Sequence, residues 1–120
     1  MKTQNVYIEG ASDGAPFLKI LIADNFFHRL KGLMFRKEMP QNTGLLLIPC
    51  NSIHMCFMCF AIDAIYIDRE HKILKVVKNL KPWVGLSTCR KAWATLEIKA
   101  GEAERYGFAV GKKLIRKELG

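Results

Sequence analysis

The fold is indicated most clearly by Ile62-Asp63-Ala64-Ile65-Tyr66-Ile67, followed by Asp68-Arg69-Glu70-His71-Lys72 and then by Ile73-Leu74-Lys75-Val76-Val77. Two short runs rich in β-branched and aromatic residues, separated by a polar connection, predict two antiparallel strands joined by a hairpin turn. Asp63 places a carboxylate inside the first run, where every neighbour is apolar or aromatic. The hairpin thus contains one residue that needs a polar partner.

Similar short runs recur on both sides of this hairpin, separated by turn-forming residues such as 12–16 and 39–44. The complete set of expected strands is 5–9, 17–23, 45–48, 53–60, 62–67, 73–77, 93–99 and 112–118. Short helices are expected at 25–31, where Asp24 can cap the first turn, and at 101–106. Because these helices are too few for regular βαβ crossovers, we expect a mainly β domain: a small barrel-like or rolled mixed sheet of six to eight short strands with two short helices, one of them covering an opening.

The composition sets the class of protein. The chain has 120 residues, of which 50% are apolar and 25% are charged. These values fit a single domain over residues 1–120 with one modest core, and they exclude disorder. No run of 18 apolar residues occurs, and the first residues do not resemble a secretory signal. We therefore expect no membrane partner and a cytoplasmic location.

The charge is strongly basic. Lys and Arg total 19 against 11 Asp and Glu, which gives a net charge of +8. Seven basic residues lie between positions 69 and 91, where Glu70 is the single acid, and residues 112–117 add four more. Such a surface is either a solvated basic face or a site for nucleic acid or a small anionic molecule.

Four cysteines stand at positions 50, 56, 59 and 89. In a chain without a secretory signal we expect free, buried thiols. Cys56 and Cys59 have C-x-x-C spacing, but residues three apart on a strand point to opposite faces, and no second pair of similar spacing completes a zinc site. We therefore predict no structural metal and no cofactor.

The expected strand 53–60 carries several chemically useful side chains. If the segment is extended, His54, Cys56 and Met58 share one face. All three are soft-metal donors, although cysteine and methionine are also ordinary core residues. The segment is therefore either a binding surface or part of the core.

Asp63 is the other candidate. A carboxylate inside an apolar strand must find a partner, because burying an unpaired charge is expensive. That partner is either a side chain, His54, Arg29 or Arg36, or a set of backbone amides at a strand break. A His–Asp pair beside a groove can act as an acid/base pair. However, the sequence contains no G-x-S-x-G nucleophile segment, phosphate loop or dinucleotide glycine pattern.

Three segments together resemble one known family. They are Arg29-Leu30-Lys31-Gly32-Leu33-Met34-Phe35-Arg36, Pro49-Cys50-Asn51-Ser52-Ile53-His54-Met55-Cys56-Phe57-Met58 with Ile62-Asp63 soon after, and Leu96-Glu97-Ile98-Lys99-Ala100-Gly101. They correspond to the patterns R-x-x-G-L-M-x-R, P-C-x-S-I-H-x-x-x-M and L-E-L-x-A-G. In combination they resemble the domain of unknown function family numbered 192, a small prokaryotic domain.

The resemblance implies a compact, mainly β domain and supplies no activity. The signature positions that it carries over to this chain are Arg29, Gly32, Met34, Arg36, His54, Met58 and Asp63. Cys59 departs from the basic residue that relatives usually have after the methionine, and Met55 and Cys56 depart from the usual small polar and aromatic residues. If the family binds an anion through that basic residue, the site is weaker in this chain.

Three functions are competing hypotheses. The first is a binding module whose pocket takes a small anionic ligand or a partner peptide and is lined by Arg29, Arg36, His54, Met58 and Asp63. The second is an enzyme in which Asp63 orients His54 as an acid/base. The third is a nucleic-acid-associated protein that uses its basic surface. Binding of a soft metal by His54, Cys56 and Met58 is ranked below these three.

Overall fold

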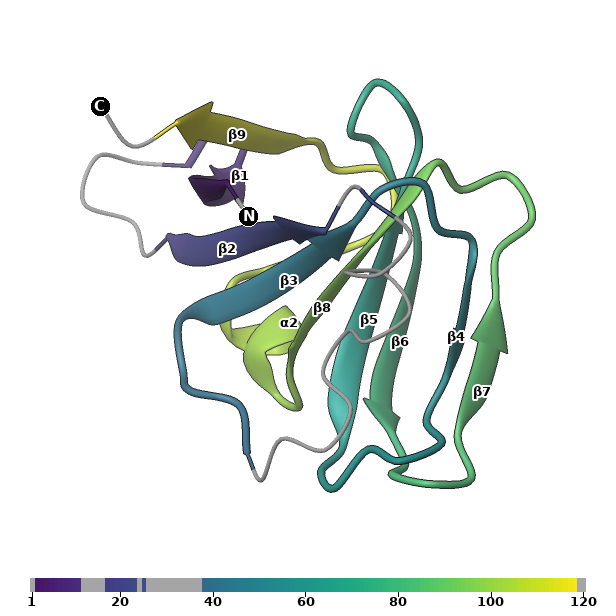
Figure 1. The fold of residues 1–120 in the computed structure, drawn as a ribbon. Helices are drawn as coiled ribbons and strands as arrows, with labels where there is room; N and C mark the ends of the chain where they lie inside the picture. The colour runs from purple at the N-terminus through teal and green to yellow at the C-terminus, as the bar shows by residue number, and fades with distance from the viewer. Residues whose placement is uncertain (1, 12–16, 24, 26–37, 119–120) are drawn as a thin grey trace.

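The computed structural model describes residues 2–11, 17–23, 25 and 38–118. The strands in these residues form a seven-stranded mixed sheet in the order β6-β5-β8-β3-β2-β1-β9 and a separate ribbon of β4 and β7 (Figure 1). Their bounds are β1 Thr3–Ile8, β2 Leu18–Ala23, β3 Thr43–Leu47, β4 Ser52–His54, β5 Ile62–Ile67, β6 Ile73–Leu80, β7 Leu86–Thr88, β8 Ala94–Lys99 and β9 Leu114–Glu118. The mainly β class is therefore confirmed.

The predicted hairpin is confirmed as β5 and β6. Its turn is fixed by Asp68, whose Oδ1 accepts hydrogen bonds from the backbone N–H groups of Glu70 and Lys72, both at 2.9 Å. Such a side-chain acceptor replaces the partners that a turning backbone loses. β6 is an edge strand of the sheet, and its lysines are exposed, which discourages pairing with other chains.

The large sheet curls until its two edge strands meet at one end. There the Ile73 N–H donates to the Lys112 carbonyl at 2.8 Å, and the Leu114 N–H donates to the His71 carbonyl at 2.9 Å. We call this contact between residues 71–73 and 111–114 the seam. It closes one end of a curled half-barrel, as expected for a rolled sheet.

Both faces of the sheet are covered. One face packs around the short helix α2 (Glu102–Arg105), which contributes Ala103, and the segment after it, which contributes Tyr106 and Phe108. The opposite face packs under the β4–β7 ribbon. Every residue of β5 is consequently buried, on whichever face its side chain lies.

The prediction of one extended strand over 53–60 is wrong. β4 ends at His54, and the chain turns at Cys56 and Phe57 because the Met55 carbonyl accepts the Met58 N–H at 3.0 Å. The turn ends the alternation of side chains, so His54 and Cys56 are exposed while Met58 is buried. The common face that the soft-metal hypothesis required is therefore not formed.

Other expectations differ in smaller ways. β7 lies between residues 77 and 93, where no strand is expected from the sequence, and α2 is the single helix in the part of the chain that the structure describes. The helix expected over 25–31 falls outside the described residues, apart from Asn25. All four cysteines are free thiols, but none of them is buried as predicted: Cys56 and Cys59 are exposed, and Cys50 and Cys89 are half-buried. Among the described residues, no helix has the length and apolar character needed to span a membrane.

Candidate functional site

Asp63 anchors the backbone of two other segments. A bulge in the β5–β6 pairing leaves the Asn79 N–H without a ladder partner, and Asp63 Oδ1 accepts it at 2.8 Å. Asp63 Oδ2 accepts the N–H groups of Gly101 and Ala103 at 2.9 and 3.0 Å, and thereby caps the first turn of α2. Of the two alternatives for Asp63, the structure shows capping of backbone amides.

The structure separates the predicted site residues that it describes. Asp63 faces α2, whereas Met58 packs on the opposite face of the sheet with Ile62 and Ala64. His54 is exposed on the ribbon, and within the described residues the carboxylate of Asp63 accepts hydrogen bonds from the backbone amides of other segments. The two remaining candidates, Arg29 and Arg36, lie outside the described residues.

A buried polar group of side chains lies on the ribbon side of the sheet. It consists of Tyr66 on β5, Glu97 on the adjacent strand β8 and Ser87 on β7. Glu97 Oε2, the Tyr66 hydroxyl and the Ser87 hydroxyl are buried without a hydrogen bond of normal geometry within the described structure. Burial raises the pKa of Glu97 to about 7, and burial also raises the pKa of Tyr66. The domain therefore holds a carboxyl group whose charged form is disfavoured.

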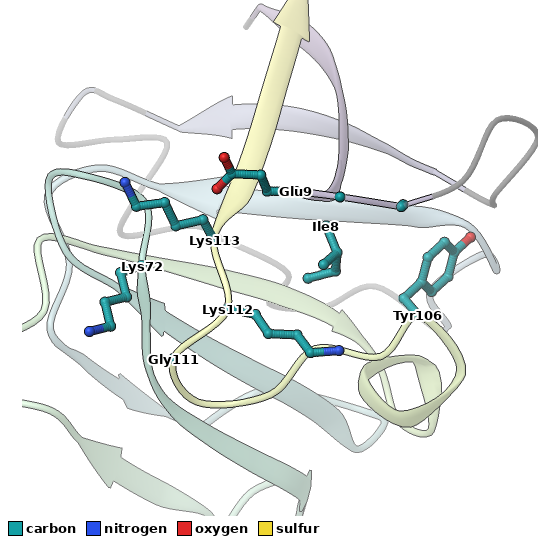
Figure 2. A pocket seen from close by; sticks show the side chains of 9 residues that line it. Ile8, Glu9, Lys72, Tyr106, Gly111, Lys112 and Lys113 are labelled. Atoms are coloured by element: carbon teal, nitrogen blue, oxygen red, sulfur yellow. The ribbon is translucent and has the colours of Figure 1, made fainter.

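A charged hollow lies beside the seam and has a volume of about 690 Å³. Three lysines line it, Lys72 from the β5–β6 turn and Lys112 and Lys113 from the segment before β9, while Glu9 is the one acid among the described residues of the lining. Figure 2 shows Lys112 extending toward Tyr106, whereas the ammonium groups of Lys72 and Lys113 point in the opposite direction. We call this feature the basic hollow.

His71 lies at the seam and responds to the local positive charge. Burial lowers the pKa of His71 from its usual 6.5, and the cations of Arg116 and Lys113 lower it further, against the opposing effect of Asp68. Arg116 Nη1 lies 3.3 Å from His71 Nε2. Because arginine only donates hydrogen bonds, Nε2 accepts, and protonation of this nitrogen breaks the bond. The pKa of His71 therefore reports the electrostatic potential at the seam.

We expect the pKa of His71, measured by NMR titration, to lie below 6.5 and to rise in Arg116→Gln. Since the folded-state value is below the unfolded one, the unfolded chain binds more protons, and His71 lowers stability as the pH falls below 6.5. Urea denaturation at pH 7.5 and 5.5 measures this effect against His71→Asn. A His71 pKa above 6.5 that is unchanged in Arg116→Gln would contradict the assignment.

Sequence reasoning recognised the two basic segments but not their meeting. Lys72 and Lys113 are 41 positions apart in the sequence and form an isolated antiparallel bridge. The two segments are joined by the curl of the whole sheet, which no local pattern reports. The one sequence signal for the basic hollow was the excess of basic residues in these two separate segments.

A comparison with protein families matches most of the chain. The model of the family DUF192, described as "Uncharacterized ACR, COG1430", matches residues 8–115. The UPF0127 protein of Pyrococcus furiosus is 32% identical over 102 residues, which cover 81% of this chain and 85% of that protein. A UPF0127 protein of Pyrococcus horikoshii is 37% identical over 70 residues, which cover 54% of this chain and 58% of that protein.

Two solved structures share the fold. A protein of unknown function from Novosphingobium aromaticivorans has a TM-score of 0.79 at 23% identity, covering 94% of this chain and 83% of that one. A putative transcription regulator from Sinorhizobium meliloti has a TM-score of 0.82 at 21% identity, covering 96% of this chain and 92% of that one. At these identities the likeness concerns the architecture.

Proposed function

This chain belongs to the DUF192 family, whose description gives no activity, and we propose that it is a binding module for a small anionic ligand held in the basic hollow. The observation that carries the proposal is the meeting of two basic segments around one concavity at the seam. Concave sites with a few convergent polar groups are the usual places where small molecules bind.

The charge of the hollow supports an anion. Its lining holds three lysine ammonium groups and one carboxylate, that of Glu9. Arg116, whose cation lowers the pKa of the neighbouring His71, lies on the adjoining strand β9 and adds to the positive potential. Clefts lined by charge of one sign raise the local concentration of the opposite ion.

The arrangement of the lysines favours a ligand with two or more negative groups. Lys112 and Lys113 leave successive residues in opposite directions, and Lys72, the bridge partner of Lys113, lies on the same side as Lys113 (Figure 2). A single compact anion meets Lys112 on one side or Lys72 and Lys113 on the other, whereas a ligand that carries two separate negative groups can meet both sides. The Tyr106 hydroxyl is engaged with the Asn42 side chain, so this residue offers the ligand its ring rather than its hydroxyl.

The direct test is calorimetric titration of the protein with inorganic pyrophosphate at low ionic strength. We expect binding that weakens as salt is added, because exposed charges are screened. In Lys112→Ala with Lys113→Ala the affinity should fall about tenfold, since each exposed ion pair contributes up to about 1 kcal/mol. The pKa of His71 should rise on binding, because the anion offsets the neighbouring cations.

Lys81→Ala is the matched control. Lys81 is an exposed lysine that follows the last residue of β6, whereas Lys72 precedes the first residue of this strand. It should leave pyrophosphate binding within about twofold, a difference of less than 1 kcal/mol. Equal losses in the double variant and in Lys81→Ala would show general charge attraction instead of a site. Tight binding of duplex DNA without binding of pyrophosphate would favour the nucleic-acid alternative.

A further inference from the structure

A second surface lies where the β4–β7 ribbon meets two loops. Its four apolar side chains are all substantially exposed: Phe57 45%, Trp83 54%, Val84 81% and Leu86 74%. The rings of Phe57 and Trp83 are in edge-to-face contact, with centroids 5.4 Å apart. We call these four residues the Trp83 surface. Exposed contiguous apolar patches of this kind mark interaction sites on proteins.

The backbone holds the two aromatic residues in strained conformations. Phe57 and Trp83 have φ of 65° and 67°, in the left-handed region that costs a side-chain-bearing residue about 1 kcal/mol or more. Trp83 is the central residue of a tight turn in which the Val84 N–H donates to the Pro82 carbonyl at 2.8 Å, and the Trp83 N–H donates to the Met55 carbonyl at 2.9 Å. Strain that the surrounding structure enforces in this way is concentrated at functional sites.

Gly85 fixes the loop against the protein. A Cβ atom at this position would lie 2.5 Å from the Lys81 carbonyl oxygen and 2.8 Å from Met55 Cγ, so no larger residue fits. The Trp83 turn is therefore pressed onto the body of the domain instead of extending into solvent. Its exposed side chains form a rigid surface that loses little entropy on binding.

The outer edge of β7 presents unused backbone groups beside this surface. The Met55 N–H donates to the Gly85 carbonyl and the Cys89 N–H to the Asn51 carbonyl, which fixes the hydrogen-bonded pairs of the ribbon. By the alternation of an antiparallel ladder, the peptide groups of Leu86 and Thr88 point away from β4. The carbonyl of Thr88 already accepts a hydrogen bond from Lys75 Nζ at 2.9 Å. Within the described strands β7 pairs with β4 alone, so this edge can accept another strand (Figure 1).

The charge around this edge has one sign. Residues 49–62 and 73–90, which contain the ribbon and both loops, include four Lys and Arg and no Asp or Glu. Lys78 and Lys81 are exposed, and Lys75 reaches across to β7. A second copy of this chain would bring like charges together, which disfavours self-association through this surface. An acidic partner meets complementary charge.

We propose that the β7 edge and the Trp83 surface dock an extended acidic peptide of a partner protein, which adds a strand to the ribbon. Main-chain hydrogen bonds to Leu86 N–H and C=O and to Thr88 N–H align the peptide. Its apolar side chains contact Leu86 and Val84, and its carboxylates pair with Lys78 and Lys81. This docking site is separate from the basic hollow, which lies at the opposite end of β6.

The test is selection from a phage-displayed library of random twelve-residue peptides on the full chain, followed by fluorescence anisotropy with the selected peptides. We expect selected sequences to be rich in Asp, Glu and β-branched residues. Val84→Ser should weaken binding about tenfold through lost apolar burial, while Val110→Ser, at another exposed valine, should not. Thr88→Pro should weaken it about fivefold by removing one edge donor, while Thr88→Ala should not.

Near-UV circular dichroism establishes whether each variant is folded. If Thr88→Pro does not fold, Val84→Ser still tests the proposal. The proposal is overturned if no acidic peptide is selected, or if the selected peptides bind Val84→Ser and wild type equally. It is also overturned if Val84→Ser abolishes binding to vesicles of anionic phospholipid while peptides do not bind. Concentration-dependent dimerisation lost in Val84→Ser would assign the surface to a second copy instead.

Discussion

Replacing Asp63 with alanine is expected to lower the free energy of unfolding by about 4 kcal/mol, a large part of the total stability of a small domain. The substitution removes the acceptor of three backbone N–H groups, those of Asn79, Gly101 and Ala103. Each of them then lacks a partner in a buried or partly buried setting, which is costlier than never having formed the bond. Urea denaturation followed by far-UV circular dichroism measures the loss.

Asp68→Ala is the matched control, because Asp68 also accepts two backbone amides but does so in an exposed turn. There water can replace the lost acceptor, and we expect a loss of about 1 kcal/mol. Asp63→Asn should recover less than half of the deficit, since its carboxamide keeps one acceptor oxygen but directs an NH₂ group toward other donors. A loss in Asp63→Ala no larger than that in Asp68→Ala would refute the anchoring role.

Replacing Glu97 with glutamine is expected to stabilise the domain at pH 8. Glu97 is 5% exposed, and burial raises the pKa of its carboxyl from 4.5 to about 7. Because the folded state holds the proton more tightly than the unfolded state, stability falls as the pH rises from 4.5 to about 7 and stays low above it. A shift of this size corresponds to about 3 kcal/mol, which is the upper limit of the gain from removing the charge.

The gain in Glu97→Gln should disappear near pH 4.5, where the native carboxyl is already protonated. Urea denaturation of both proteins at pH 4.5 and pH 8 measures the difference directly. Glu104→Gln, at an exposed position of α2, should show no comparable pH-dependent gain. If the two substitutions gave the same result at pH 8, the raised pKa of Glu97 would be refuted.

The regular strands could be predicted because their signals are local. β5 has the predicted bounds, and β2 and β8 differ from the predicted ones by one residue at most, since each is a short apolar or alternating run ended by turn residues. The ribbon could not be predicted in the same way. β4 and β7 have three residues each, and their pairing joins residues that are 32 to 36 positions apart. Runs this short have no measurable periodicity.

The candidate site was predicted less well than the fold, for a physical reason. Asp63 was recognised as a residue in need of a partner, but whether a side chain or a helix terminus supplies it depends on which segment packs against β5. The side of β8 that carries Glu97 also carries Thr95 and is polar. The β4–β7 ribbon nevertheless covers this side, so the burial of Glu97 follows from the topology of the fold and not from the local sequence. The turn at Phe57 likewise depends on a contact with a distant loop.

The seam has a thermodynamic consequence for any molecule that occupies the basic hollow. The walls of that hollow come from the two opposite borders of one continuous sheet, Lys72 on one side and Lys112 with Lys113 on the other. An anion that bridges them opposes the unrolling of the sheet, and unrolling in turn disperses the charges that hold the anion. Ligand affinity and closure of the sheet are therefore coupled: binding of the anion stabilises the closed sheet, and any change that opens the sheet weakens binding.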